Sequence, residues 1–243
     1  MTRSSPGLGA AVEQDGFAVV ADVVPAGLVD RVLSAVEEAR SESLQRDGET
    51  YGMRDLLRAV PEARRIAGDP VLLGLAETIV GPGAFAVRGL WFDKTDGANW
   101  GVPWHQDTTI AVRERREAAG FGPWTVKMGI THVRPPASVL EGMVTLRLHM
   151  DDCDTSNGPL RVIPGSHRGG RLDARESSQW LDRASAVECL VPRGGVILMR
   201  PLILHSSSAA TAPHHRRVLH LEYAARPLTG GLEWFERVGR NDS

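Results

Sequence analysis

Two histidines and an aspartate have the side-chain types of a metal site, although they are far apart in the sequence. His105 and Asp107 are separated by one residue, and His205 lies 100 residues beyond His105. On a strand, residues two apart point to the same face, so His105 and Asp107 can present an imidazole and a carboxylate to one point. Two imidazoles and one carboxylate on one face of an iron ion leave positions open for a co-substrate and for oxygen. Zinc accepts the same ligands, so the triad alone leaves the metal open.

An arginine further along the chain could anchor an anionic co-substrate of such a metal. A dicarboxylate that binds the metal through one end needs a cation for its distal carboxylate, and a guanidinium binds a carboxylate through two hydrogen bonds. Arg216 and Arg217 lie eleven and twelve residues after His205, and strand alternation lets only one of them point inward. The more apolar positions of the following run share the parity of Arg217, so alternation by itself favours Arg217 for the buried face.

The elements that must position these residues differ before and after about residue 84. From about residue 10 to residue 80 we expect a helical buttress, because apolar residues recur with the period of a helix over Leu28–Ala39, Arg54–Ala67 and Val71–Val80. From about residue 84 to residue 226, short apolar or alternating runs between Gly, Pro, Asn and Asp predict strands. These runs are Phe85–Phe92, Val126–Val133, Met143–Met150, Leu160–Ile163, Val187–Val191, Val196–Met199 and Val218–Tyr223.

Regularly spaced short strands with N-terminal helices predict a mostly β, α+β fold: a cupin-like jelly roll, or double-stranded β-helix. No composition shift marks a boundary, so we expect a single domain over residues 1–243. The formal net charge of −2 gives no field that would draw the chain to nucleic acid or an anionic membrane. Two cysteines, no leader-like N-terminus and no apolar run of about 18 residues predict a cytoplasmic protein.

Four stretches resemble the phytanoyl-CoA dioxygenase family of Fe(II)- and 2-oxoglutarate-dependent oxygenases. They are Asp93-Lys94, Trp104–Asp107 (WHQD), Asn157–His167 (NGPLRVIPGSH), and His205 with Arg216. The resemblance covers roughly Gly16 to Trp234. It implies a jelly-roll core with helices against one sheet, and iron held by the residues that match His105, Asp107 and His205. In the family the 2-oxoglutarate arginine lies eleven residues beyond the distal histidine, which selects Arg216 over Arg217.

The same resemblance assigns further residues to the co-substrate. Ser207, two residues after His205, matches a hydroxyl-bearing position that accompanies the arginine in the family. Arg147, Leu90 and Phe92 stand at strand positions that lie beside 2-oxoglutarate in relatives. No catalytic residue beyond the metal ligands is expected.

The segment Phe121–Pro136, rich in Gly, Pro and Trp, is interpreted as a loop over the mouth of the pocket. Residues expected to contact the substrate are Arg54, Lys127, His132 and Trp104. The remaining histidines are interpreted as structural. His149 is interpreted as a strand residue that faces away from the site or makes a buried hydrogen bond, and His167 as a residue that caps or staples its own turn. His214, His215 and His220 are interpreted as solvated positions.

The function predicted is oxidation of a small molecule that uses Fe(II), 2-oxoglutarate and O2 and releases succinate and CO2. Hydroxylation is favoured over halogenation, because halogenating relatives replace the carboxylate at the position of Asp107 with a small residue. An amino-acid-like molecule or a secondary metabolite is the expected substrate, and no site for a coenzyme A moiety is evident. Desaturation, epimerisation and cyclisation need only another fate of the substrate radical, so they stay open.

Two other classes of protein are weaker interpretations. A cupin-like isomerase or hydrolase would use the same ligands without 2-oxoglutarate, but the spacing of Arg216 argues against it. A non-catalytic binding protein that kept the fold has no reason to keep all three ligands. The pattern does not predict the substrate, the carbon oxidised, the pathway or the oligomeric state.

Overall fold

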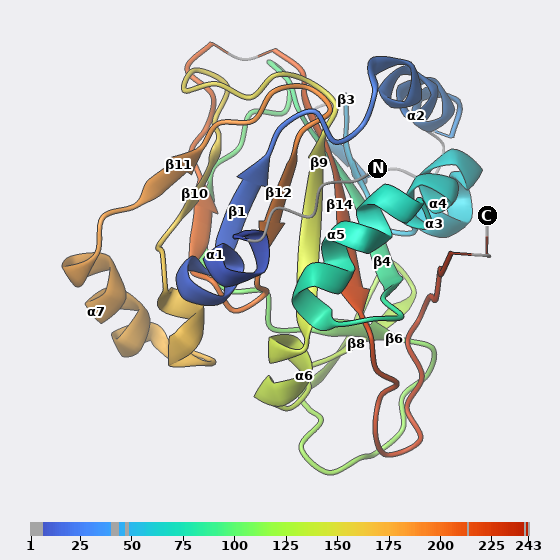
Figure 1. Cartoon of the computed structure of the whole chain (residues 1–243), viewed down its shortest axis with the longest axis vertical. Coiled ribbons are helices and arrows are strands. Elements are labelled where there is room, and N and C mark those ends of the chain that lie inside the picture. The colour runs from blue at the N-terminus through green and yellow to red at the C-terminus, as the bar shows by residue number, and fades with distance from the viewer. Residues whose placement is uncertain (1–6, 40–43, 47–48, 213, 241, 243) are drawn as a thin grey trace.

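The computed structural model describes residues 7–39, 44–46, 49–212, 214–240 and 242. Its centre is a seven-stranded antiparallel sheet (Figure 1). In spatial order the strands are β1 (Phe17–Val20), β12 (Val196–Met199), β9 (Met143–His149), β14 (Arg216–Ala224), β4 (Phe85–Lys94), β3 (Glu49–Met53) and β2 (Leu44–Arg46). A four-stranded antiparallel sheet lies opposite, in the order β11 (Val187–Cys189), β10 (Leu160–Val162), β13 (His205–Ser207) and β5 (Val102–His105). The predicted jelly roll is confirmed.

Helices cover the outer face of the large sheet (Figure 1). They are α1 (Leu8–Asp15), α2 (Ala26–Glu38), α3 (Leu56–Ala59), α4 (Pro61–Ala67) and α5 (Pro70–Val80). Their apolar residues and the outward-facing residues of β9, β12 and β14 form one buried cluster. Within it, the hydroxyl of Tyr223 on β14 donates a hydrogen bond to the carbonyl of Ala67 at 3.0 Å. The helices therefore fix the outer face of the strands that carry the site on their inner face.

Local sequence explains which face of α2 is buried and where α5 begins. In α2 the residues Val29, Val32 and Val36 are buried, and their spacing places them on one stripe. In α5 the side chain of Asp69 accepts a hydrogen bond from the backbone N–H of Val71, and Pro70 occupies the first turn, where a missing N–H costs nothing. The apolar residues that recur with the helical period are therefore the ones that pack against the sheet.

Strand alternation on β14 separates two environments. Leu219, Leu221 and Tyr223 point to the helices, whereas His220 and Glu222 line a cavity between the two sheets. Both faces of this strand are buried, and so both parities are protected from solvent. The more apolar parity marks the helix side rather than the side of the site.

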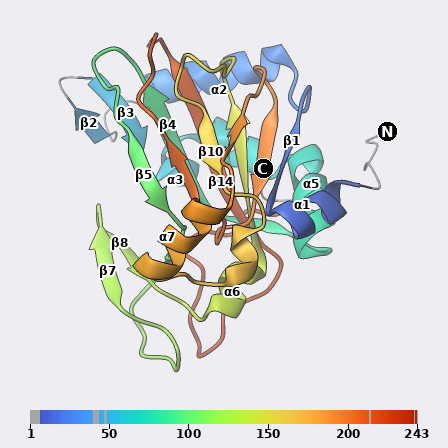
Figure 2. The same cartoon turned by 90° about the vertical axis from the view of Figure 1, so that its left-hand side faces the viewer.

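The segment expected to be a loop over the pocket, Phe121–Pro136, forms a hairpin instead. In a third sheet, the central strand β8 (Ile130–Val133) pairs with β7 (Trp124–Lys127) on one side and with β6 (Ile110–Val112) on the other. Met128 and Gly129 form the tip with positive φ angles of 52° and 76°. The run Val126–Val133 is therefore not one strand, because its apolar pattern spans a two-residue turn. Figure 2 shows this hairpin projecting beside the sheets.

The expected helical region also needs correction, since it contains strands β1, β2 and β3. β1 pairs with β12, and β3 pairs with β4, so these short strands extend the large sheet at both edges. The other helices are α6 (Ala137–Glu141), the 3-10 helix η2 (Ser166–Gly169) and α7 (Ala174–Arg183). None of the helices in the described ranges combines the length and the apolar character that a membrane span requires.

Candidate active site

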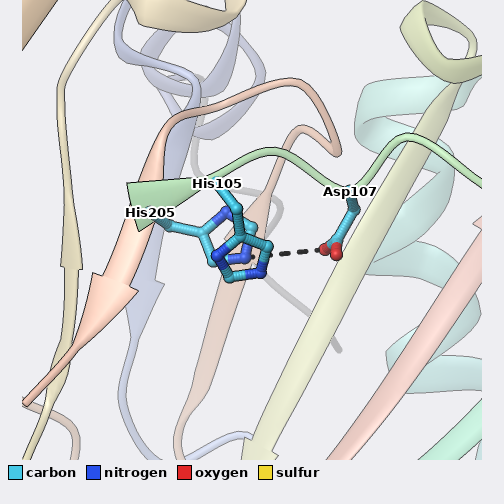
Figure 3. A group of neighbouring side chains, drawn as sticks. All are labelled: His105, Asp107 and His205. Atoms are coloured by element: carbon cyan, nitrogen blue, oxygen red, sulfur yellow. Dashed lines mark ion pairs between the residues drawn. The ribbon is translucent and has the colours of Figure 1, made fainter. Parts of the chain in front are cut away.

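His105, Asp107 and His205 converge at one point between the sheets (Figure 3). Candidate ligand atoms of the three side chains all lie within 4.8 Å of one another. His105 and His205 are register partners on β5 and β13, and their ring centroids are 4.2 Å apart. His205 Nε2 lies 3.7 Å from Asp107 Oδ2. This is the arrangement that a single ion with three protein ligands requires.

Backbone carbonyls orient both imidazole rings. His105 Nδ1 lies 2.8 Å from the carbonyl of Pro103, and His205 Nδ1 lies 2.9 Å from the carbonyl of Ile203. A carbonyl only accepts hydrogen bonds, so each Nδ1 carries a proton, and Nε2 is the ring atom that each histidine can offer to a metal. His205 is the first residue of β13.

Asp107 lies beyond the end of β5 rather than on the same strand as His105. The chain is held there by the backbone N–H of Asp107, which donates to the carbonyl of Pro201 at 2.9 Å. Between the two ligands, Gln106 Nε2 donates to the carbonyls of Gly170 at 2.8 Å and Leu202 at 2.6 Å. The prediction that the pair faces one point is correct, but these loop contacts position Asp107.

The electrostatics of the triad suit a cation. Desolvation raises the pKa of Asp107, but the neighbouring imidazoles of His205, His220 and His105 outweigh it, so the net pKa lies below the ordinary value. Burial lowers the pKa of His205 despite the opposing charge of Asp107. The site therefore holds an ionised carboxylate and a neutral imidazole. Asp107 Oδ2 is buried with no hydrogen-bond partner among the described residues.

A cavity of about 380 Å³ extends from the triad between the two sheets. Leu90 and Phe92 of β4 form an apolar part of its wall, and both were expected beside the co-substrate. Other lining residues come from β14, β9, β5, β10 and β13, and from the segment after His105. Both sheets therefore contribute to one enclosed site.

Two buried guanidinium groups, those of Arg216 and Arg147, line this cavity. Arg216 Nη1 donates to the carbonyl of Gly158 at 2.8 Å, and Arg147 Nη1 donates to His220 Nδ1 at 2.9 Å. Neither guanidinium forms an ion pair with any carboxylate in the described part of the chain, and the Nε of each is buried without a partner. Desolvation, together with the positive charge of Arg216, lowers the pKa of Arg147 to about 10. Two positively charged side chains thus face the cavity, and neither is ion-paired with a carboxylate of the described residues.

Ser207 lines the cavity, and the buried Lys94 lies directly behind it. Lys94 Nζ donates to the carbonyl of Ser208 at 2.6 Å and to Ser207 Oγ at 3.2 Å. Burial, with the charges of Arg216 and Arg147, lowers the pKa of Lys94 to about 7. Lys94 therefore holds the end of β13 and carries a charge that is sensitive to near-neutral pH.

Of the residues expected to contact the substrate, Arg54 and Lys127 line the cavity, but Trp104 and His132 do not. Trp104 points away from His105 because neighbouring strand residues alternate, and Arg161 lies 5.4 Å from the centre of its ring. His132 is buried in the third sheet, where its Nδ1 lies 2.9 Å from the carbonyl of Ile130. Both expectations are corrected for direct lining of the pocket.

Three titratable residues of the cavity wall were missed or misassigned. His220 was expected to be solvated, yet it is 4% exposed and lines the wall. Arg88 on β4 and Glu222 on β14 are buried and hydrogen-bonded to one another. A usable signal existed, because Arg88 shares the parity of Leu90 and Phe92, and His220 and Glu222 share the parity of Arg216.

The other histidines lie outside the cavity. His149 is buried on β9 and neither ring nitrogen has a partner among the described residues, so the expected hydrogen bond is missing. His167 contacts the carbonyl of Glu13 at 3.1 Å and therefore staples its turn, η2, to α1, which is one of the two roles expected for it. His214 is exposed, and so is His215, which pairs with Asp93 at 3.0 Å.

Comparison of the sequence with known families and proteins gives consistent results. The profile of the family described as phytanoyl-CoA dioxygenase (PhyH) matches residues 12–218. An L-proline trans-4-hydroxylase from Streptomyces griseoviridis is 28% identical over 229 residues, and the match covers 81% of this chain and 76% of that protein.

Solved structures share the fold over nearly the whole chain. EctD from S. alaskensis with bound Fe superposes with a TM-score of 0.72 at 21% identity, covering 100% of this chain and 87% of that one. The non-haem α-ketoglutarate-dependent carbocyclase SnoK from nogalamycin biosynthesis gives 0.72 at 16% identity, covering 99% and 89%. At these identities the likeness concerns the fold.

Proposed function

The chain belongs to the phytanoyl-CoA dioxygenase family of Fe(II)- and 2-oxoglutarate-dependent oxygenases, and on that premise we propose that it hydroxylates a small amino-acid-like molecule. One observation carries the proposal: a three-ligand metal site and two buried guanidiniums without counter-ions share one cavity. The first suits iron, and the second suits a dianionic co-substrate.

The described residues fit an Fe(II) ion at the triad. His105 Nε2, His205 Nε2 and a carboxylate oxygen of Asp107 would hold it, because both Nδ1 atoms are engaged with carbonyls and Asp107 Oδ2 is a buried acceptor without a donor. Bound Fe(II) would activate O2, the oxidant, and 2-oxoglutarate would supply two of the four electrons that O2 accepts as it is cleaved to succinate and CO2; the substrate would supply the other two. The protein's task is to fix these groups and to place one substrate carbon beside them.

The described residues also fit 2-oxoglutarate. Arg216 would bind the distal carboxylate, for which its unpartnered Nε and its near-complete burial are suited. Ser207 Oγ, already an acceptor from Lys94, can donate its own proton to the same carboxylate. Arg147 adds a second positive charge, and Leu90 and Phe92 keep water from the carbon chain.

Asp107 is proposed as the reason for hydroxylation rather than halogenation, since a carboxylate fills the third ligand position. Arg54 and Lys127, which line the same cavity, would attract a carboxylate of the substrate. His132 and Trp104 are not part of this proposal, because neither lines the cavity.

An amino-acid-like substrate is preferred to a bulkier secondary metabolite. The cavity of about 380 Å³ must hold both 2-oxoglutarate and the substrate, and its wall is rich in charged groups. A relative of similar length is an L-proline trans-4-hydroxylase. We propose that the enzyme works in the cytoplasm as one domain and needs no nucleic-acid or membrane partner; two buried, free cysteines agree with a reducing compartment.

The proposal is tested by substrate-stimulated succinate formation. The purified protein is supplied with Fe(II), 2-oxoglutarate, O2 and a panel of amino acids and secondary-metabolite precursors. We expect one or more amino acids to raise succinate release above the uncoupled rate and to gain the mass of one oxygen atom. Catalysis that proceeds without 2-oxoglutarate would instead support a cupin-like isomerase or hydrolase.

A further inference from the structure

The cavity wall holds a second pair of charged groups, Arg88 on β4 and Glu222 on β14. The two residues are register partners on adjacent strands, and Arg88 Nη1 donates a hydrogen bond to Glu222 Oε1 at 3.1 Å. Their side chains are 10% and 7% exposed. Both line the cavity that the metal ligands line. The pair therefore faces the space available to a substrate rather than bulk water.

Glu222 lies far from the proposed co-substrate anchor but close to the metal ligands. Arg216 and Glu222 are six residues apart on β14, and a strand rises about 3.3 Å per residue, so about 20 Å separates their backbones. Burial raises the pKa of Glu222 and the charge of Asp107 adds to that effect, while Arg88 and His220 lower it to below its ordinary value. Glu222 is thus an ionised carboxylate within electrostatic reach of Asp107.

The Arg88–Glu222 pair keeps hydrogen-bonding capacity for a ligand. The contacts of Arg88 and of His220 Nε2, at 3.1 Å and 3.6 Å, both fall on Oε1 of Glu222, and Oε2 takes part in neither. A carboxylate offers about four acceptor positions and a guanidinium five donors. The Arg88 bond uses Nη1 alone. A ligand in the cavity can therefore donate to Glu222 and accept from Arg88.

The charges around this pair define the ligand further. Arg54 and Lys127 line the same cavity as Arg88. Three basic side chains therefore accompany the acidic Glu222 once the metal ligand Asp107 and the proposed co-substrate arginines Arg147 and Arg216 are set aside. Excess positive charge in a poorly hydrated cavity favours an anionic ligand, and a buried carboxylate favours a donor that carries positive charge. A molecule with both a carboxylate and an ammonium group satisfies the two conditions.

We propose that Glu222 binds the amino or imino nitrogen of the substrate and that Arg88 binds its carboxylate, so that the substrate is a free amino or imino acid. This inference rests on the proposed function, because it assigns the substrate class of the same cavity. Glu222 is then a specificity-determining residue. The 2-hydroxy acid analogue of an amino acid offers only a neutral hydroxyl in place of the ammonium group, and the ring-oxygen analogue of an imino acid has no proton to donate. An N-acetylated amino acid has lost the positive charge.

Binding without turnover tests this assignment. The anaerobic enzyme loaded with Fe(II) and 2-oxoglutarate is titrated calorimetrically with the common L-amino acids, L-proline included. Each amino acid that binds is compared with its analogue in which oxygen replaces the amino nitrogen and with its N-acetyl derivative. We expect both derivatives to bind at least about tenfold more weakly to the wild-type enzyme, because each leaves Glu222 without a charged donor.

The variant Glu222→Gln keeps the size of the side chain and removes its charge. We expect it to bind the amino acid at least about tenfold more weakly and to lose most of the preference over the oxygen analogue. The matched control is Asp151→Asn, which removes the ion pair with Arg217 on the other face of β14. That variant should keep every affinity within about twofold, as expected of a pair outside the cavity.

Several results would overturn the assignment. Equal binding of the amino acid and its oxygen analogue by the wild-type enzyme is one, an undiminished preference in Glu222→Gln is another, and the absence of any amino-acid ligand is a third. Should Glu222→Gln fail to fold, the double variant Arg88→Gln/Glu222→Gln keeps two uncharged hydrogen-bonding partners and tests the same loss of preference. Failure of the proposed function is seen separately, as absent 2-oxoglutarate binding in the titration that precedes the amino acid.

Discussion

Arg216 and Arg217 are adjacent in the chain and serve opposite faces of β14. Arg216 is 3% exposed and lines the cavity. Arg217 points to the other side of the sheet, where its Nη2 donates to Asp151 Oδ1 at 2.6 Å and its Nε donates to Asp151 Oδ2 at 2.9 Å. One guanidinium therefore has a protein counter-ion, and its neighbour faces a cavity without one.

Removal of each arginine should separate the two roles. Arg216→Ala is expected to raise the KM for 2-oxoglutarate at least about a hundredfold, because loss of one partner of a buried charge pair costs about 3–5 kcal/mol and each 1.4 kcal/mol is about tenfold. Arg217→Ala should change it less than about fivefold, since it loses only a pair outside the cavity. A 2-oxoglutarate titration of succinate formation measures both. The reverse ranking would contradict the assignment of Arg216.

Substitution of any metal ligand should abolish iron binding and leave the fold. His105→Ala, Asp107→Ala and His205→Ala are each expected to weaken Fe(II) binding by more than about a hundredfold, since even loss of a partner that only orients a ligand costs about 10–100-fold. Anaerobic calorimetry with Fe(II) and circular dichroism measure the two properties. The exposed His215→Ala serves as control and should bind iron normally. A ligand variant with full iron occupancy would show that the triad is wrong.

Arg147 should contribute less to 2-oxoglutarate binding than Arg216. Arg147 already donates to His220, but its buried Nε lacks a partner and its charge faces the same cavity. We expect Arg147→Met to raise the KM for 2-oxoglutarate by about tenfold, in line with the loss of one charge-assisted hydrogen bond. Arg147→Lys should recover part of that loss because it restores the charge. An unchanged KM in Arg147→Met would remove this residue from the co-substrate site.

Lys94 should make stability depend on pH in a defined window. Burial lowers the pKa of Lys94 from 10.5 to about 7, so between these values the unfolded chain binds a proton that the folded chain does not. The free energy of unfolding must then rise with pH across that window. Wild-type stability minus that of Lys94→Met, measured by urea unfolding without 2-oxoglutarate, is expected to increase from pH 7 to pH 10. A constant or falling difference would mean that Lys94 stays charged in the fold.

Sequence patterns predict the strands of the core well, because apolar runs between turn residues are local features. The run Val196–Met199 coincides with β12, and Phe85–Phe92 lies within β4. The two histidine ligands and Arg216 were found through motif spacing. The hairpin of β7 and β8 was missed because its turn places Met128, which is not a typical turn residue, at a positive φ.

The alternation of hydrophobic and polar residues alone does not predict which charged side chains of the large sheet point into the cavity. Arg88, His220 and Glu222 lie within runs that are buried on both faces, so hydrophobicity does not distinguish the helix side from the cavity side. Only the pairing of β4 with β14 places Arg88 next to Glu222. That pairing joins residues 134 positions apart, which no local pattern contains.

The two histidine ligands belong to the small sheet, and Arg216 and Arg147 belong to the large one. The gap between the sheets is filled by a buried apolar cluster to which both contribute, among them Leu160 and Val162 from one side and Ile197 and Met199 from the other. The thickness of this packing therefore sets the distance between the two histidines and the two guanidiniums, which the proposed co-substrate would have to span. If Arg216 binds the distal carboxylate as proposed, a 2-oxo diacid one carbon shorter or longer than 2-oxoglutarate should bind more weakly, because the packed sheets hold the triad and the guanidiniums at a fixed separation.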